Sequence, residues 1–239
     1  MELRARPPNV VAHRGASSLA PENTLSSVRK ALEIGAKMIE VDVHTTLDGE
    51  IVVMHDADVS RTTNGSGVIS EMSYSRIAQL DAGSWFGPEF RGEGVPALDE
   101  VLSTVRGRSV LCIEIKRAYP KEVLEKVLKH GLLDDVVIFD FDHQRLRELR
   151  SEEADVCTLA LGVDSASLTN IEREGFDALG ASFSKANEEL VERAHEIGMA
   201  VFVYTVDDVD RMRRLIEIGV DGIISNKPQD CIPLVEGLK

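Results

Sequence analysis

The feature that most constrains the fold of this chain is a recurring unit in which an amphipathic helical stretch, a glycine and a short β-branched run follow one another. The unit occurs five times, and its glycines are Gly35, Gly131, Gly175, Gly198 and Gly219. Each glycine stands where a helix needs a residue that tolerates a positive φ after its last turn. The strand runs are apolar almost throughout, as parallel strands buried on both faces are. The repeat therefore predicts parallel βα units.

Nine strand-like runs can be counted, near residues 9–13, 38–44, 51–55, 110–116, 136–141, 156–161, 178–183, 200–206 and 221–225. Between the second and third runs lies Asp48-Gly49, a strong hairpin signal. We expect the third run to fold back antiparallel on the second through a two-residue turn, which would place Asp42 opposite His55. The other eight runs would close a TIM (β/α)₈ barrel as a single domain, 1–239. A doubly wound open sheet is the alternative, but no Gly-rich fingerprint follows the first strand.

One segment, residues 56–98, interrupts the rhythm of the repeat. It is rich in Gly, Ser and Thr, carries the only tryptophan, Trp85, and has a helix-like stretch near Met72–Leu80. An insertion this long in a compact barrel is usually functional. We expect it to cap the mouth of the active site, with a plain surface excursion as the alternative.

Charge and cysteine usage exclude several classes of protein. With 27 Lys and Arg against 41 Asp and Glu, the net charge is −14, which argues against a nucleic-acid or anionic-membrane surface. Three widely spaced cysteines, Cys112, Cys157 and Cys231, indicate reduced thiols and a cytoplasmic protein. We see no signal peptide and no transmembrane stretch, so we expect no stable membrane insertion. The sequence leaves the oligomeric state open, a homo-oligomer included.

Polar side chains gather at the ends of the first four strand-like runs. They are His13, Arg14, Glu40, Asp42, His55, Glu114 and Lys116. In a barrel of this kind the active site is built at the carboxyl ends of the strands. Each residue alone would have an ordinary structural explanation, but their convergence on adjacent strand ends favours a site. The other histidines, namely His44, His130, His143 and His195, we interpret as structural or surface residues.

The chemistry of this set points to a phosphate ester. Glu40, Asp42 and Glu114 in one barrel mouth would repel each other unless a cation lies between them. Oxygen ligands favour Mg²⁺ or Ca²⁺ over zinc. Beside that ion, Arg14 and Lys116 would suit an anionic substrate. The two histidines can share general acid and general base work. Together the residues predict metal-assisted displacement at a phosphate.

The chain resembles the glycerophosphodiester phosphodiesterases along nearly its whole length. The resemblance rests on His13-Arg14-Gly15, Pro21-Glu22-Asn23-Thr24, Glu40-x-Asp42, Asp48-Gly49, His55-Asp56, Arg61-Thr62-Thr63, Pro96-x-Leu98, Glu114-Ile115-Lys116 and Gly222-Ile223-Ile224. As a set these motifs are highly specific. The resemblance implies a TIM barrel that cleaves glycerophosphodiesters, such as glycerophosphocholine or glycerophosphoethanolamine, into an alcohol and sn-glycerol 3-phosphate.

By the same resemblance, residue for residue, the three carboxylates would bind one Mg²⁺ or Ca²⁺, and Arg14 and Lys116 would hold the phosphate. His13 and His55 would be the acid/base pair. In the family's usual mechanism the glycerol 2-hydroxyl attacks phosphorus, and water then opens the cyclic phosphate. Such an intramolecular attack has a high effective molarity.

Two motifs depart from the family's usual pattern. Tyr204-Thr205-Val206-Asp207 stands where Trp-Thr-Val-Asn is typical, and Ser225-Asn226 stands where Thr-Asp is frequent. Tyr204 keeps an aromatic pocket wall, which we expect Trp85 and Phe86 of the insertion to complete. These departures bear on the choice of substrate more than on the class of reaction.

Two alternative functions follow from the same residues. A lysophospholipase D would need an apolar channel for an acyl chain, which Tyr74, Trp85, Phe86 and Phe90 could supply. A non-catalytic phosphoglycerol-binding barrel is the other alternative. The intact histidine pair argues against it, because binding alone needs no acid and base.

Overall fold

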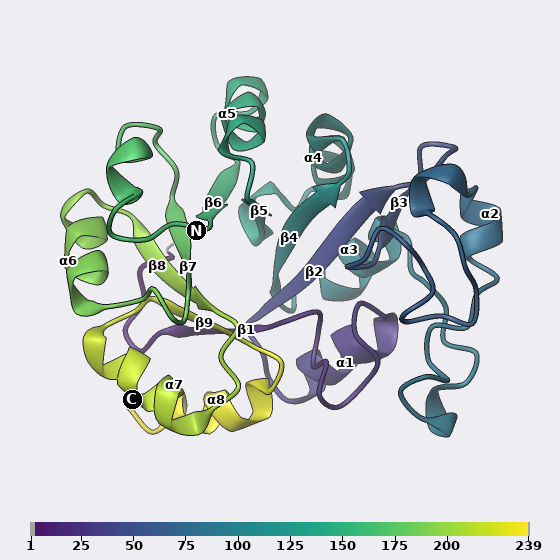
Figure 1. Cartoon of the computed structure of the whole chain (residues 1–239), viewed down its shortest axis with the longest axis horizontal. Helices are drawn as coiled ribbons and strands as arrows, with labels where there is room; N and C mark the ends of the chain where they lie inside the picture. The colour runs from purple at the N-terminus through teal and green to yellow at the C-terminus, as the bar shows by residue number, and fades with distance from the viewer. Residues whose placement is uncertain (1–2, 239) are drawn as a thin grey trace.

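In the computed structural model, which describes residues 3–238, eight parallel strands close into a barrel with helices on its outside (Figure 1). The barrel strands are β1 (Asn9–Ala12), β2 (Met38–Thr45), β4 (Val110–Arg117), β5 (Val136–Asp140), β6 (Cys157–Leu161), β7 (Ala178–Ser182), β8 (Ala200–Tyr204) and β9 (Gly222–Ser225). Each strand pairs with the next in the chain, and β1 closes the ring by pairing with both β9 and β2. The predicted TIM barrel is confirmed and the open sheet is excluded. Met1, Glu2 and Lys239, the ends of the predicted domain, lie outside the described residues.

In the described part of the chain, seven helices follow barrel strands and cover the outside of the ring. They are α1 (Leu25–Glu33), α3 (Leu98–Val105), α4 (Pro120–His130), α5 (His143–Glu152), α6 (Glu188–Glu196), α7 (Val209–Ile218) and α8 (Pro228–Glu236). Capping residues set their ends, as at α1, where the Thr24 side chain accepts a hydrogen bond from the Ser27 backbone N–H. All five glycines of the repeat have positive φ, as predicted. Among the described residues, no helix is long and apolar enough to cross a bilayer.

One of the five predicted helical stretches is not an α-helix. Between β6 and β7 the chain forms only the short 3₁₀ turn η4 (Leu168–Asn170) and further turns, although Gly175 keeps its φ of 72°. Leu168 and Ile171 are the apolar side chains that this stretch buries before the glycine. Because a helix in a protein is stabilised mainly by packing of its apolar face, two buried side chains are too few to stabilise a longer helix here.

The two faces of each barrel strand have different partners. Along β2, Met38 packs in the barrel interior with Val11 and Phe202, whereas Ile39 and the alternate residues after it pack toward the helices. Because side chains alternate across a strand, Glu40 and Asp42 share the interior face with Met38. The interior is therefore apolar toward the amino ends of the strands and acidic toward their carboxyl ends.

The strand β3 (Ile51–Val53) pairs antiparallel with the end of β2, so the predicted hairpin is confirmed. Its predicted two-residue turn is wrong. Val43 pairs with Val53, and Thr46 N–H donates to the Glu50 carbonyl, which leaves the three residues 47–49 in the loop. Gly49 has a φ of 84°, which suits a three-residue hairpin loop with its last residue in the left-handed region.

This shift of one residue changes the predicted cross-strand pair. The Met54 backbone N–H donates to the Asp42 carbonyl, so Met54, and not His55, lies opposite Asp42. The regular ladder ends at Val53, and His55 approaches the barrel mouth from the irregular chain that follows.

The rest of the inserted segment forms a small lobe beside the barrel, next to β3 and α1 (Figure 1). It contains η1 (Ile69–Glu71), α2 (Tyr74–Ile77) and η2 (Pro88–Phe90), so the short helix predicted there is present. The lobe packs against β3 and the residue after it through an apolar cluster, whose buried members are Val52, Met54, Val59, Ile69, Met72, Ile77, Ala82 and Val95. It is tied to the barrel at the start of α1, where Glu93 accepts hydrogen bonds from the Ser26 backbone N–H and hydroxyl.

Packing at the amino end of the barrel can be tested at Gly222. A Cβ there would lie 2.2 Å from Cδ1 of the fully buried Phe202 ring. We expect Gly222→Ala to lower the free energy of unfolding by about 3 kcal/mol, measured by urea denaturation, because the ring has no room to move. Gly94→Ala is the matched control, since nothing lies within 4 Å of its Cβ position. Equal losses in the two variants would contradict this account of the packing.

Candidate active site

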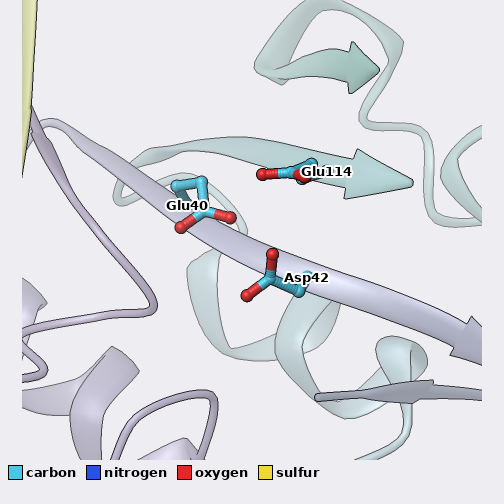
Figure 2. Close-up of side chains that lie close together, drawn as sticks. All are labelled: Glu40, Asp42 and Glu114. Atoms are coloured by element: carbon cyan, nitrogen blue, oxygen red, sulfur yellow. The ribbon is translucent and has the colours of Figure 1, made fainter. Parts of the chain in front are cut away.

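Three carboxylates meet at the carboxyl end of the barrel. β2 supplies Glu40 and Asp42, and the neighbouring β4 supplies Glu114 (Figure 2). Asp42 pairs with Glu114 across the two strands, and one oxygen from each of the three side chains lies within 4.8 Å of the others. All three residues are buried. The period-two alternation of parallel strands thus brings together the carboxylates that sequence analysis grouped.

Two cations from opposite sides partly balance this charge. Lys116 Nζ lies 3.2 Å from Asp42 Oδ1 and also contacts the Glu114 carboxylate. Arg14 Nε lies 3.2 Å from the other oxygen of Asp42. Burial alone would raise the pKa of Asp42, but Lys116 and Arg14 hold it below its usual range.

The other two carboxyls are less well compensated. Burial, with the charges of Asp42 and Glu114 added, raises the pKa of Glu40 well above its ordinary value. Burial, with Asp42 again adding to it, raises the pKa of Glu114 to about 7. One oxygen of Glu40, Oε1, is buried without a hydrogen-bond partner among residues 3–238. Buried carboxyls of this kind are electrostatically incomplete and attract a further positive charge.

A hard divalent cation fits this donor set. The three groups that converge are all carboxylate oxygens, which suit Mg²⁺ or Ca²⁺ and are poor ligands for softer metals. The unpartnered Glu40 oxygen gives the cation a free ligand atom. The residues present therefore fit the cation that the sequence implies.

His13 follows β1 and faces the carboxylates. Its Nε2 lies 3.8 Å from Glu40 Oε2, and its Nδ1 lies 2.7 Å from Asn226 Oδ1. Burial and the nearby Arg14 charge lower the pKa of His13, so the ring is neutral near pH 7. A neutral imidazole beside the carboxylates can accept a proton.

Arg14 owes its position to an unusual backbone conformation. Its φ is 54°, in the left-handed region that non-glycine residues adopt rarely. In this conformation its backbone N–H donates to Glu40 Oε2 at 2.8 Å, while the guanidinium reaches Asp42 and, at 2.9 Å, Glu22. Arg14 therefore joins the backbone of the first loop to two of the three carboxylates.

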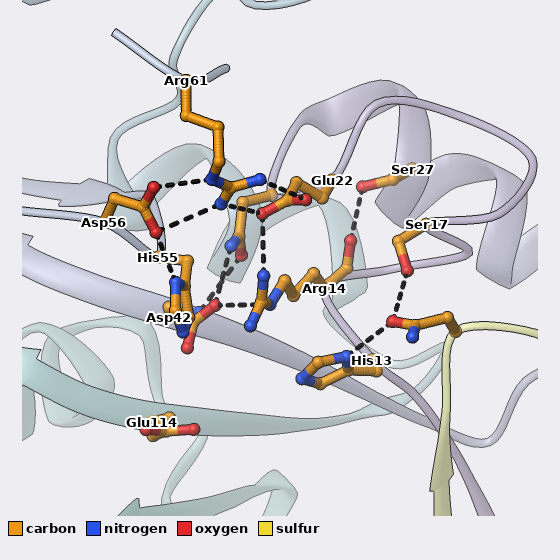
Figure 3. A network of polar contacts seen from close by, with 12 residues as sticks. His13, Arg14, Ser17, Glu22, Ser27, Asp42, His55, Asp56, Arg61 and Glu114 are labelled. Atoms are coloured by element: carbon orange, nitrogen blue, oxygen red, sulfur yellow. Dashed lines mark hydrogen bonds and ion pairs between the residues drawn. The ribbon is translucent and has the colours of Figure 1, made fainter. Parts of the chain in front are cut away.

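His55 is held by a chain of charged groups that crosses the barrel mouth (Figure 3). Its Nδ1 lies 2.6 Å from Asp56 Oδ1, and Arg61 Nε donates to the second Asp56 oxygen at 2.6 Å. Arg61 also donates to Glu22, the partner of Arg14. The first residues of the insertion are thereby linked to the loop that follows β1.

Glu22, Asn23 and Arg61 are residues to which sequence reasoning gave no role. Asn23 has a φ of 58°, and its side chain both donates to Asp42 Oδ2 and accepts from the Asp42 backbone N–H. All three lie in motifs noted for their resemblance to the family, which was the available signal. Their contacts depend on loop conformations, which spacing alone does not give.

A small cavity opens between the site and an apolar wall. The residues that line it are His13, Glu40, Glu114, Phe139, Phe141, Leu161, Tyr204 and Ile224. Tyr204 lies where it was expected, and its ring meets that of Phe141 edge to face with centroids 6.0 Å apart. Phe141 was missed, although its place directly after β5 at the barrel mouth could have identified it.

Trp85 and Phe86 do not line this cavity. They pack against each other edge to face in the lobe, and the indole N–H donates to the Ala82 carbonyl at 2.8 Å. Since local contacts hold both rings in the lobe, the expectation that they complete the pocket wall is not met. Only the beginning of the insertion, through Asp56 and Arg61, reaches the polar network.

The histidines interpreted as structural have structural partners. His130 bonds to Asp99, His195 to Asp221, and His143 to the Leu161 carbonyl. The ring of His44 donates from Nε2 to the His55 carbonyl at 3.0 Å. His44 thus supports the backbone of a site residue without lining the cavity.

Comparison with known proteins gives a consistent result. Residues 13–230 match the model of the Glycerophosphoryl diester phosphodiesterase family. A glycerophosphodiester phosphodiesterase of Caldanaerobacter subterraneus is 36% identical over 236 residues, covering 95% of this chain and 97% of the relative. A glycerophosphodiester phosphodiesterase of Bacillus subtilis is 34% identical over 243 residues, covering 91% of this chain and 83% of the relative.

Solved structures agree with the sequence relatives. A glycerophosphodiester phosphodiesterase from Agrobacterium tumefaciens superposes with a TM-score of 0.87 and 31% identity, covering 95% of this chain and 99% of that one. A phosphodiesterase from Oleispira antarctica, solved in complex with the product sn-glycerol-3-phosphate, superposes with a TM-score of 0.88 and 28% identity, covering 96% and 97%.

The raised pKa of Glu114 generates a prediction about stability. Because that pKa is about 7, the native state holds a proton that the unfolded chain releases above its ordinary Glu pKa of about 4.3. The contribution of this group to stability therefore falls as the pH rises through this range. In chelator, we expect the wild-type free energy of unfolding to fall between about pH 5 and about pH 8, and that of Glu114→Gln to fall less.

Divalent ions should stabilise the wild type more than they stabilise Glu114→Gln. At an ion concentration about 100 times Kd, binding stabilises the wild type by about 2.7 kcal/mol, which Glu114→Gln should largely lose. Chemical denaturation with and without Mg²⁺ or Ca²⁺ measures both effects. The control is Glu217→Gln on the exposed face of α7, which should match the wild type throughout. The same ion-induced stabilisation in Glu114→Gln would contradict the assignment.

Proposed function

Because this chain belongs to the glycerophosphoryl diester phosphodiesterase family and is therefore a phosphodiesterase, we propose that it hydrolyses deacylated glycerophosphodiesters, such as glycerophosphocholine and glycerophosphoethanolamine. The products are an alcohol and sn-glycerol 3-phosphate. The observation that carries this proposal is the convergence of Glu40, Asp42 and Glu114 beside two cationic side chains and two histidines. The product named for the Oleispira antarctica relative is consistent with it.

Glu40, Asp42 and Glu114 would hold one Mg²⁺ or Ca²⁺ in this function. The bound ion would neutralise charge on the phosphate oxygens and so favour nucleophilic attack on phosphorus. Lys116, which contacts two of the carboxylates, and Arg14 then hold the remaining phosphate oxygens. Arg14 offers a planar fork of donors and Lys116 a compact charge.

His13 and His55 carry out the proton transfers in the proposed mechanism. The glycerol 2-hydroxyl attacks phosphorus and gives its proton to one ring, while the leaving alcohol takes a proton from the other. Water then opens the cyclic phosphate, and the two proton transfers run in reverse. Each ring has one nitrogen tied to a fixed partner, Asn226 for His13 and Asp56 for His55, which leaves Nε2 available for this work.

The substrate's alcohol group is expected to lie against the apolar wall of the cavity. Tyr204 and Phe141 form this wall near the mouth, and the Phe141 side chain is more than half exposed. An exposed aromatic at the mouth also favours a second candidate, lysophospholipase D activity with the acyl chain on this wall. The four residues first expected to supply an acyl channel do not line that cavity; they are Tyr74, Trp85, Phe86 and Phe90. We propose that the insertion acts at the mouth through Asp56 and Arg61.

Activity assays test this function and separate it from its alternatives. Glycerophosphocholine should release glycerol phosphate and choline in the presence of Mg²⁺ or Ca²⁺, and chelator should abolish the release. Ion-dependent release of choline from lysophosphatidylcholine in parallel reactions would identify lysophospholipase D activity. Absence of ion-dependent release from both substrates would leave the non-catalytic binding barrel.

The histidine roles have their own test. His13→Ala and His55→Ala should each lower kcat by about 10²–10⁴, because each removes one of the two proton-transfer groups. His130→Ala is the matched control, since His130 bonds to Asp99 on the outside of the barrel and should retain wild-type kcat. Unchanged turnover in either of the first two variants would refute the roles while sparing the family assignment.

A further inference from the structure

Asn226, the residue after β9, joins His13 to a carboxylate outside the group of three. Its Oδ1 lies 2.7 Å from His13 Nδ1, and its Nδ2 donates to Asp207 Oδ2 at 2.7 Å. Within residues 3–238, neither Asn226 nor Asp207 forms a hydrogen bond or an ion pair with the three converging carboxylates. Both belong to the two motifs that depart from the family's usual pattern.

The Asn226 amide and the Asp207 carboxylate form a complementary pair. The two side chains are hydrogen-bonded to each other. His13 therefore has a neutral amide oxygen as its partner, whereas His55 has the charged Asp56.

Asp207 fixes the direction in which the Asn226 amide points. A carboxylate only accepts hydrogen bonds, so the amide must turn its NH₂ group to Asp207 and its oxygen to His13. The carboxylate itself is held in place, because its Oδ1 accepts from the Asn226 backbone N–H at 2.8 Å and from the Ser225 hydroxyl at 3.1 Å. An amide flip would set Oδ1 against the Asp207 carboxylate, so the hydrogen bond from Nδ2 to Asp207 and the one from His13 to Oδ1 would both be lost.

The orientation of the amide in turn fixes the tautomer of His13. An amide oxygen cannot donate, so His13 Nδ1 must carry the proton of the neutral ring, and the lone pair is on Nε2. The same oxygen accepts from the Ser17 hydroxyl at 3.0 Å, so both of its acceptor positions are used. Nε2 is the ring nitrogen that lies near Glu40, toward the carboxylates.

We propose that Asn226 and Asp207 are positioning residues that hold His13 as its Nδ1–H tautomer, with the Nε2 lone pair directed at the substrate. The inference rests on the proposed proton-transfer role of His13. It extends that role to two residues that never contact the reacting atoms. Removal of the outer partners of a metal-ligating histidine typically costs about 10–100-fold in activity, and we expect a loss of the same order for a histidine that transfers protons.

The tautomer can be observed without turnover. In protein labelled with ¹⁵N-histidine, at a pH about two units above the ordinary histidine pKa of about 6.5, long-range ¹H–¹⁵N spectra distinguish the two tautomers. We expect His13, assigned by the signal lost in His13→Gln, to be the Nδ1–H form in the wild type and to shift toward Nε2–H in Asn226→Ala. An Nε2–H ring in the wild-type protein would overturn the proposal.

Exchange of the pair gives a second, independent test. Asn226→Asp alone sets two carboxylates against each other and loses the Nδ2 donor, and Asp207→Asn alone removes the charge that orients the amide. We expect each to lower kcat about 10–100-fold with little change in KM. The double variant restores one donor and one acceptor in contact and should recover kcat to within about threefold of the wild type. If the kcat of the double variant is no higher than the two single losses multiplied together predict, the proposal that Asn226 and Asp207 act as a pair is overturned.

A control variant and the activity of the wild type distinguish a failure of this inference from a failure of the proposed function. Asn187→Asp makes the same chemical change at the N-cap of α6, outside the site, and should leave kcat and the His13 spectrum unchanged. A wild-type protein without phosphodiesterase activity would refute the proposed function, and the spectrum of that protein would still decide the tautomer. Full activity in His13→Gln would overturn the positioning role together with that of His13.

Discussion

The mutual repulsion of three buried carboxylates is the constraint on which the rest of this site depends. Glu40, Asp42 and Glu114 are brought within one ion's reach by two adjacent strands, and a barrel interior cannot leave such charge uncompensated. Lys116 and Arg14 compensate mainly Asp42, whose pKa is lowered, while the pKa values of the two glutamates stay raised. The two cations therefore leave part of the negative charge of Glu40 and Glu114 uncompensated, and the proposed divalent cation would complete the balance.

The short pairing between β1 and β2 explains how loops far apart in the sequence contribute residues to one site. These strands pair over only two residues, Val11 with Met38 and Ala12 with Ile39, after which β2 continues and pairs with β3 instead. Beyond this pairing, the first loop still bonds to β2, for example from the Gly15 backbone N–H to the Glu40 carbonyl. This loop carries His13 and Arg14, and the chain after β3 brings His55 and Arg61 to the same place. Glu22 joins the two segments through its ion pairs with Arg14 and Arg61.

Sequence reasoning succeeded where a regular period governs position. Strand alternation placed Glu40 with Asp42 and Glu114 with Lys116, and the helix–Gly–strand repeat gave the barrel. It failed where the length of a turn or the conformation of a loop determines which residues come into contact. The Asp48-Gly49 turn is longer than expected, so the register differs by one, and Trp85 is held by lobe contacts that no period encodes. The link from Asn226 to His13 joins the two ends of the chain and becomes visible only once the barrel has closed.

The separate apolar cluster of the lobe has a consequence for how such proteins can diverge. A one-residue insertion or deletion within β2 would turn the carboxylates outward under the helices, so this strand tolerates almost no change in length. The lobe buries side chains such as Ile69 and Ile77 in a cluster apart from the barrel core, which it meets at Val52 of β3, so a change in its length acts first on that cluster. Changes of length should therefore accumulate between Arg61 and Pro96, while the barrel strands keep their lengths.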